Sequence, residues 1–168
     1  MTRSRVFESY CADIDSLLRD GQLRSALRFS LALPDICVAL EEAQMSAAPH
    51  RYAAWCATWL HLDRPAGLKV VDGKRVHRFY MRVAGMRSTG ALNMETTADA
   101  LRGLRLRRRA RGERALGRSR VWQPTGTVQS FKLSLSEGLV AAARRWYREH
   151  GASDRQVQHN LGQLAVSG

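Results

Sequence analysis

Residues 23 to 40 constrain the fold more than any other stretch of this chain, because they are apolar around most of the circumference of a helix. Such a helix must be covered on several sides, so the sequence predicts a helical bundle with this segment at its centre. Pro34 lies inside the segment and cannot donate the backbone hydrogen bond that an internal helical position makes. We therefore expect the helix to bend or break near Leu33.

Apolar residues at spacings of three and four predict further helices on both sides of this segment. The first begins after Ser4, which is a suitable N-cap, and ends at Gly21. Another covers residues 50–62 and directs Trp55 and Trp59 toward the core. The two tryptophans could also form a platform for stacked bases, but their helical spacing favours packing in the core.

A third amphipathic helix is expected over residues 74–87, where apolar side chains again recur with helical periodicity. Asp72 and Gly73 could instead form the turn of a hairpin, and the downstream periodicity argues against that alternative. Arginines of this helix lie on or beside the flank of its apolar face: Arg75, Arg78 and Arg82.

The C-terminal part of the sequence shows both strand and helix signals. Residues 121–135 are typical of one or two short strands around a Pro-Thr-Gly turn at 124–126. The last long helix begins with the capping-box pattern of Ser134 and Glu137 and ends at Gly151. The predicted fold class is therefore mainly α, a helical bundle with a short β-hairpin before the last long helix.

The length of the chain is that of one ordinary domain. With 168 residues, of which 45% are hydrophobic, it can build a real core. We expect a single helical domain over residues 1–151, in which the basic segment 101–120 is an insertion or a loop. Residues 152–168 are expected to form a C-terminal tail or a weak helix.

Positive charge is concentrated in one region of the sequence. The chain carries 27 Lys and Arg against 15 Asp and Glu, a formal net charge of +12 at pH 7. Residues 1–60 hold six basic and seven acidic side chains (net −1), whereas residues 61–120 hold sixteen and five (net +11). A GC-rich genome could explain why arginine outnumbers lysine, but it does not explain the shortage of acids. The leading inference is a polyanionic partner.

Residues 101–120 contain nine arginines and a single acid, Glu113. Here and in the preceding helix we expect the arginines to contact backbone phosphates, so that affinity falls steeply as salt rises. A solvated surface is the plain alternative, and an acidic protein partner would use the same arginines. The predicted nucleic-acid-binding residues are Arg75, Arg78, Arg82, Arg87, Arg102, Arg105, Arg107, Arg108, Arg109, Arg111, Arg114, Arg118 and Arg120.

Motifs for most other chemistry are missing from the sequence. There is no Gly-rich phosphate loop, no carboxylate pair that stands out and no cluster of histidines, so we expect neither a metal nor a cofactor. Cys11, Cys37 and Cys56 lack metal-ligand spacing and are expected to be buried, reduced thiols. No signal peptide or membrane-spanning stretch is recognisable, so we expect a cytoplasmic protein without a membrane partner.

The stretch LRSALRFSLALPDICVALE, followed by RYAAWCATWL, resembles the opening of a group of uncharacterised bacterial proteins. In those proteins a helix of the type ALALALTLPDICG-LE precedes an RYI-WF helix and then a segment of the type YALRCSFLHQG. That last segment is similar to the active motif of HEPN domains, which are all-helical, usually dimeric bundles. In them an arginine, four to six residues and a histidine make a metal-independent ribonuclease site. The resemblance covers roughly residues 7 to 90 and the final long helix.

This chain departs from the HEPN motif at the histidine. YMRVAGMRSTG, residues 80–90, falls where the family's segment would fall, so Arg82 matches the motif arginine and Arg87 stands at the histidine position. An arginine stays protonated and cannot serve as a general base. The resemblance therefore implies a nucleic-acid-binding protein, with RNA favoured over DNA, that is similar to a HEPN ribonuclease without its catalytic histidine. It also implies a homodimer.

Two alternatives stay open. One is an active endoribonuclease with Arg82 as the catalytic cation, because RNA cleavage needs only one base and one cation on the phosphate. Arg145 and His150, or Arg144 and His150, also satisfy the motif spacing, although a basic last helical turn has a structural explanation. His77 could approach Arg82 in reversed order. The other alternative is an interaction module for an acidic protein, for instance in phage defence or a toxin–antitoxin system.

Overall fold

The computed structural model of the protein describes residues 3–45, 47–62, 72–83 and 126–166. Within these residues the secondary structure is helical and contains no strand. Its elements are α1 (Arg3–Arg19), α2 (Leu23–Glu41), α3 (Pro49–Trp59), α4 (Gly73–Val83), α6 (Thr127–Trp146), a π-helical turn at Tyr147–Gly151, and α7 (Arg155–Val166). The predicted helical bundle is therefore confirmed for the described part of the chain.

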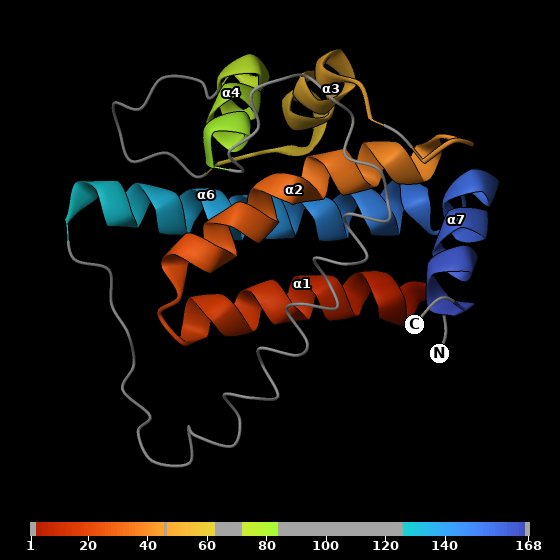
Figure 1. Cartoon of the computed structure of the whole chain (residues 1–168), viewed down its shortest axis with the longest axis horizontal. Coiled ribbons are helices and arrows are strands. Elements are labelled where there is room, and N and C mark those ends of the chain that lie inside the picture. Colours follow the sequence, from red (N-terminus) through yellow and green to blue (C-terminus); the bar gives the residue numbers. More distant parts are fainter. Residues whose placement is uncertain (1–2, 46, 63–71, 84–125, 167–168) are drawn as a thin grey trace, which may run out of the picture.

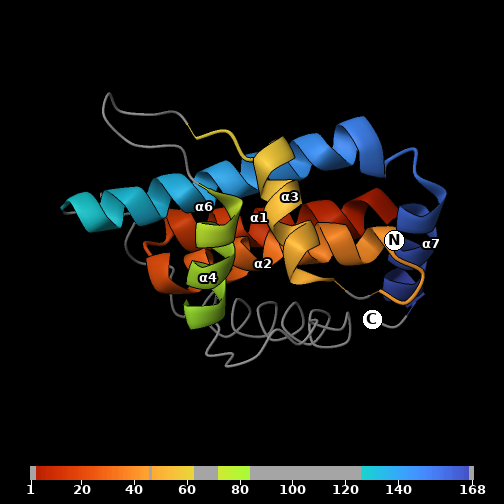
Figure 2. The same ribbon diagram turned by 90° about the horizontal axis from the view of Figure 1, so that it is seen from above.

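Helix α2 lies at the centre of the bundle. It packs against α1, α3, α4, α6 and α7. In Figure 1, α1 lies on one side of α2 and α6, the helices α3 and α4 lie on the other, and α7 crosses the end near both termini. Figure 2 shows α3 and α4 side by side on top of α2 and α6. The central position predicted for residues 23–40 is thus confirmed.

Burial along α2 explains this arrangement. Every residue from Leu33 to Leu40 is buried, including Asp35. A helix with so little exposed circumference is stable only when neighbours cover it all round, and each buried aliphatic side chain contributes about 1.5 to 3 kcal/mol. The surrounding helices supply that cover with their own apolar stripes, such as Phe7 and Ile14 of α1 and Leu139 of α6.

Pro34 does not break α2, which runs as one helix from Leu23 to Glu41. Proline has no N–H, so the carbonyl of Ser30 loses its usual helical donor and the ladder is weakened there. Two tyrosines from other helices donate hydrogen bonds to the carbonyls of the residues on either side of Ser30. Tyr52 Oη lies 2.7 Å from the Leu31 carbonyl oxygen, and Tyr10 Oη lies 3.0 Å from that of Phe29. These two bonds do not replace the one that Pro34 removes; they tie α2 to α3 and to α1 on both sides of the Ser30 carbonyl.

The short β-hairpin expected before the last long helix is not supported. Residues 127–135 form the first turns of α6, which begins at Thr127 after Gly126 rather than at Ser134. The alternation in FKLSL suggested a strand, but Leu135 and Leu139 continue one buried helical stripe against α2. Packing of that stripe outweighs the short local pattern. Residues 121–125 of the expected strands lie outside the described residues.

The C-terminal segment forms a packed helix. Val157 and Leu161 of α7 are buried, and α7 lies against α1 and α2. The buried Asn160 amide nitrogen lies 2.9 Å from the carbonyl oxygens of Leu40 and Glu42, so it donates to the C-terminal end of α2. The weak helix expected within residues 152–168 is thus a helix that caps the central one.

We expect Tyr52→Phe to destabilise the protein by about 1 to 3 kcal/mol, because the substitution leaves a buried carbonyl of α2 without its hydroxyl donor. Urea unfolding followed by circular dichroism measures the change. Tyr147→Phe is the matched control, since the Tyr147 hydroxyl is half-buried and lies 3.3 Å from the Gln158 side chain. Equal losses in the two variants would contradict a special role for the bond beside Pro34.

Candidate nucleic-acid interface

Helix α4 carries the arginines singled out from the sequence, and its start is fixed by Asp72. The Asp72 Oδ1 atom accepts a hydrogen bond from the Lys74 backbone N–H at 3.0 Å, and the Asp72 carbonyl accepts from the N–H of Arg75 and Val76. A carboxylate at this position satisfies free N–H groups and suits the helix dipole. The chain is helical here, so it does not form the alternative hairpin around Asp72 and Gly73.

Gly73 lets α4 begin directly against α3. A Cβ atom at this position would lie 2.3 Å from the Ala53 carbonyl oxygen, which is backbone and cannot turn aside. Glycine is therefore required for the close approach of the two helices. Val76 and Tyr80 continue the same buried side of α4, at spacings of three and four residues.

Tyr80 ties α4 to both α2 and α3. Its ring stacks on Tyr52, with the centroids 5.4 Å apart and the planes 7° from parallel. Its hydroxyl donates to Asp35 Oδ2 at 3.2 Å. His77, half-buried on the same helix, meets the Tyr52 ring edge-on at 4.9 Å, and burial lowers its pKa. These contacts fix the rotation of α4 about its axis.

Asp35 is a carboxyl group placed in the core. Burial raises its pKa from 3.8 to about 6, and the hydrogen bond from Tyr80 works in the opposite direction. Burial and the neighbouring carboxyl group raise the pKa of Tyr80, so its hydroxyl stays protonated and donates. Above pH 6 the folded protein therefore holds a buried negative charge beneath α4.

Opposite the buried side, α4 presents its cations to solvent. Arg75, Arg78 and Arg82 are all exposed, at spacings of three and four residues, and Lys74 lies beside them. Within the described part of the chain, no ion pair joins these four side chains to an acid. We call these four residues the α4 row. The structure places all the predicted interface residues of Gly73–Val83 in this row.

Two further arginines, which the sequence reading missed, extend the basic surface onto α2. Arg24 and Arg28 are exposed on the first half of this otherwise covered helix. Their spacing of four residues puts them on one face, and that spacing was the available signal. The positive charge of Arg28 is close enough to Tyr80 to act against the rise of its pKa. We call Arg24 and Arg28 the α2 row.

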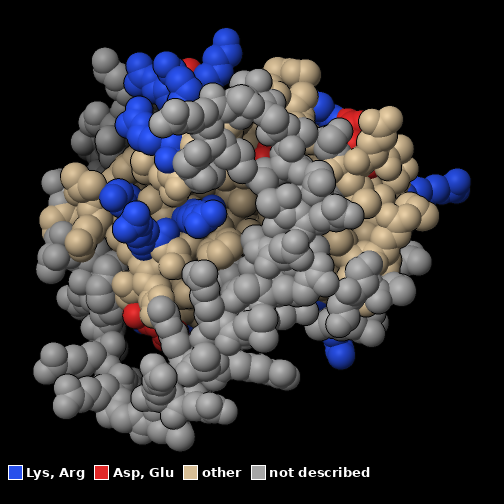
Figure 3. All heavy atoms as spheres, viewed as in Figure 1, with Lys and Arg blue, Asp and Glu red and all other residues tan. Residues whose placement is uncertain are grey.

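Figure 3 shows both rows on one side of the molecule. Blue side chains gather over α4 and, separately, over the first half of α2, with tan atoms between them. The predicted arginines of the longer basic segment lie outside the described residues: Arg87, Arg102, Arg105, Arg107, Arg108, Arg109, Arg111, Arg114, Arg118 and Arg120.

The other predicted pair, Arg145 and His150, does not lie on this basic surface. Arg145 donates to the Trp59 carbonyl oxygen at the end of α3. His150 Nε2 lies 3.4 Å from Glu41 Oε1 and 3.9 Å from Asp154 Oδ2. The two side chains thus have separate partners. Arg145 links α6 to the end of α3, and His150 links the π-helical turn to the end of α2.

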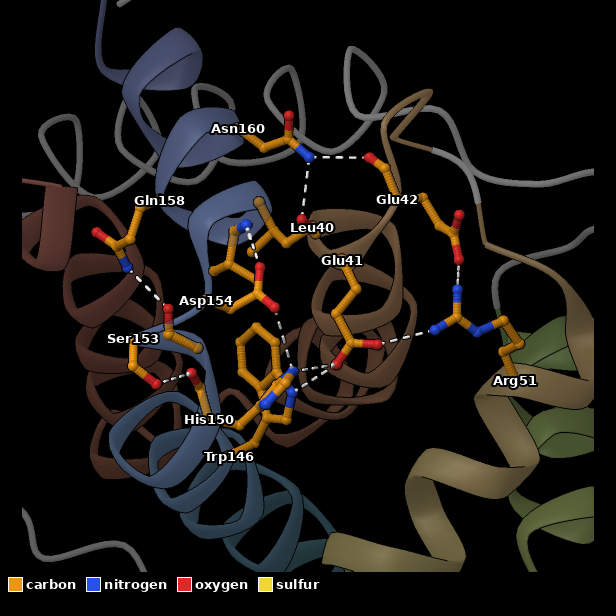
Figure 4. A network of polar contacts seen from close by, with 12 residues as sticks. Leu40, Glu41, Glu42, Arg51, Trp146, His150, Ser153, Asp154, Gln158 and Asn160 are labelled. Carbon is orange, nitrogen blue, oxygen red and sulfur yellow. Dashed lines mark hydrogen bonds and ion pairs between the residues drawn. The ribbon is translucent and has the colours of Figure 1, made fainter.

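Figure 4 shows the polar network around His150. Glu41 is its centre, because its carboxylate accepts from the Trp146 indole N–H at 2.9 Å and pairs with Arg51 at 2.9 Å. Arg51 also pairs with Glu42. Asp154 accepts from the backbone of α7 at its start. Such an arrangement fastens the end of α2 to α3, α6 and α7, and it places Arg51 and His150 beside acids.

Arg144 is likewise occupied. Its guanidinium bridges Glu8 at 2.6 Å and Asp15 at 2.8 Å, joining α6 to α1. The hydrogen bond to Glu8 raises the pKa of Arg144. Arg144 and Arg145 are the two arginines with motif spacing to His150. Neither can bind a phosphate without giving up a bond that joins two helices.

Neither a metal site nor a thiolate is found among the described residues. They contain no group of His, Cys, Asp and Glu side chains arranged to hold a metal ion. Burial raises the pKa of Cys11 and Cys56 to about 12, and the pKa of the buried Cys37 is also raised, so the thiols stay protonated. In the same part of the chain, no helix combines the length and apolar character needed to cross a membrane.

Compared with protein-family models, with curated proteins and with solved structures, the chain matches none of them. The relation to HEPN domains accordingly remains an interpretation of the sequence motifs.

Asp35→Asn should stabilise the protein above pH 7 and have little effect at pH 4. The pKa of Asp35 is higher in the folded than in the unfolded chain, so the stability that this group contributes falls as pH rises from about 4 to 6. Asparagine cannot ionise, so the variant does not lose this stability as pH rises. For a shift of two pKa units, the difference in the free energy of unfolding is at most about 3 kcal/mol.

Denaturant unfolding at pH 4 and at pH 8 measures the difference. Asp20→Asn, at an exposed position, makes the same change in charge and serves as the control. An effect of Asp35→Asn on the free energy of unfolding that is the same at pH 8 as at pH 4 would contradict a buried charge at Asp35.

Proposed function

We propose that the protein binds nucleic acid, and RNA in preference to DNA, through the exposed arginines of α4. The observation that carries this proposal is the α4 row: Arg75, Arg78 and Arg82 are exposed on one face and have no acidic partner within the described residues. The guanidinium groups of the α4 row suit phosphate oxygens, because each group offers several hydrogen-bond donors in a fixed plane.

The contrast with the other arginines supports this proposal. Arg51 and Arg144 each bridge two carboxylates and hold helices together. The buried side of α4 is meanwhile fixed by Gly73 and Tyr80, so its arginines are not needed to attach the helix. Like charges at spacings of three and four repel one another by a few tenths of a kcal/mol per pair. A polyanion removes that repulsion.

The preference for RNA rests on the resemblance of the sequence to HEPN domains, in which Arg82 matches the motif arginine. The arginine at position 87, where that motif has histidine, favours binding without cleavage. An acidic protein could bind the same arginines, and competition between RNA and polyglutamate distinguishes the two kinds of partner.

Replacing Arg75, Arg78 and Arg82 together by alanine should weaken RNA binding and reduce its dependence on salt. On a single strand, each arginine that no longer meets a phosphate lowers the slope of log K against log salt by about 0.7, so we expect a fall of about 2. Fluorescence anisotropy of labelled RNA across a salt titration measures it. The triple variant of Arg5, Arg148 and Arg155, which are exposed on other helices, removes the same charge as a control.

A slope that falls equally in both triple variants would show that net charge alone attracts RNA, and would contradict an interface on α4. In a competition experiment, unlabelled RNA and polyglutamate are each used to displace the labelled RNA. If polyglutamate is as effective as unlabelled RNA, the result favours an acidic protein as the partner. We expect the RNA to remain intact on a denaturing gel run without added metal. Cleavage that is abolished in Arg82→Ala would replace the proposal by an active ribonuclease.

A further inference from the structure

Phe79 is an aromatic side chain at the edge of the α4 row. It is half-buried and packs against the core, whereas Val76 and Tyr80 of the same helix are buried. Within the described part of the chain, its ring contacts no other aromatic ring. Part of the ring therefore stays at the surface, beside the exposed arginines.

The helical period places Phe79 between two arginines. Arg75 precedes it by four residues and Arg82 follows it by three, spacings at which the Cβ atoms on a helix are about 5 to 6 Å apart. These positions are fixed by one helix and do not depend on how helices pack. At the other edge of the row, His77 is also half-buried, but its ring is held edge-on against Tyr52.

Other aromatic side chains do not combine a surface ring with unpaired arginines in this way. Trp55, considered from the sequence as a stacking platform, is only 4% exposed. Trp59 is half-buried at the end of α3, and the arginine beside it, Arg145, is bonded to its backbone carbonyl. Phe131 is exposed on α6, but the arginines of that helix, Arg144 and Arg145, are bonded to other helices.

A nucleotide carries a flat base beside its charged phosphate. Unpaired bases stack on aromatic side chains while cations follow the backbone, whereas a duplex keeps its bases stacked on one another. We infer that the ligand of the α4 row is a single-stranded nucleic acid, with one base stacked on Phe79 and the neighbouring phosphates bound by Arg75 and Arg82. Every base has a flat face, so this contact carries little sequence preference. The inference rests on the proposed function.

The test compares Phe79→Leu with Phe131→Leu in the full chain. Leucine keeps an apolar side chain against the core but removes the flat ring, and Phe131 offers the same change at an exposed position of α6. Three probes of equal length are titrated by fluorescence anisotropy: a single-stranded RNA, the same strand with stable abasic residues, and a duplex RNA. Thermal melts establish that each variant is folded.

We expect the unchanged protein to bind the intact single strand about fivefold or more tightly than the abasic strand, because only the intact strand has a base to stack. In Phe79→Leu the affinity for the intact strand should fall by a similar factor, while the affinities for the abasic strand and the duplex stay nearly unchanged. Phe131→Leu should leave all three affinities nearly as they were. Phe79→Tyr keeps an aromatic ring and should bind the three probes as the unchanged protein does.

Equal affinity of the unchanged protein for the intact and abasic strands would overturn the inference and leave the proposed function standing. So would a loss of affinity in Phe79→Leu that is the same for all three probes, since a structural role of Phe79 in placing α4 would affect them alike. Failure to bind any of the three probes would contradict the proposed function itself.

Discussion

The hydrogen bonding around Pro34 is the feature on which the arrangement of α2, α3 and α4 depends. Pro34 removes one donor from the most buried helix of the bundle, and the hydroxyl of Tyr52 bonds to the neighbouring carbonyl of Leu31. The ring of Tyr52 then provides the surface on which Tyr80 stacks, and Tyr80 returns to α2 by its bond to Asp35. The bonds of these two tyrosines to α2, on either side of Pro34, thereby specify where α3 and α4 dock.

This docking determines which side of α4 faces solvent. Once Gly73 and Tyr80 are fixed against α3 and α2, the helical period leaves the arginines on the opposite side. The same packing brings the positive charge of the exposed Arg28 of α2 close enough to Tyr80 of α4 to affect its pKa. The basic surface is therefore a consequence of how the core is assembled, although none of its cations contributes to that core.

Much of this could be predicted from the sequence, because the signals are local. The apolar stretch of 23–40 required a central helix, and the periodicity of residues 74–87 required an amphipathic one. The start of α6 was missed because FKLSL alternates like a strand, and only the packing of Leu135 and Leu139 on α2 decides for a helix. Three-dimensional contacts outweighed local pattern at that point.

Residues whose role depends on distant partners could not be predicted. Nothing near Asn160 in the sequence indicates that its amide would cap α2 from 120 residues away. Arg24 and Arg28 were overlooked because they interrupt a segment that is otherwise apolar, and their place beside α4 appears only in the folded chain. Conversely, the spacing of Arg145 and His150 matched a motif, yet the fold gives each a separate partner.

Arginine footprinting would test the nucleic-acid interface most directly. The full chain is treated with phenylglyoxal, a reagent that modifies accessible guanidinium groups, with and without RNA, and the modified positions are located by mass spectrometry. We expect RNA to protect Arg75, Arg78 and Arg82, whereas Arg155 at the start of α7 should react equally in both samples. Equal protection at Arg155, or no protection on α4, would contradict the interface.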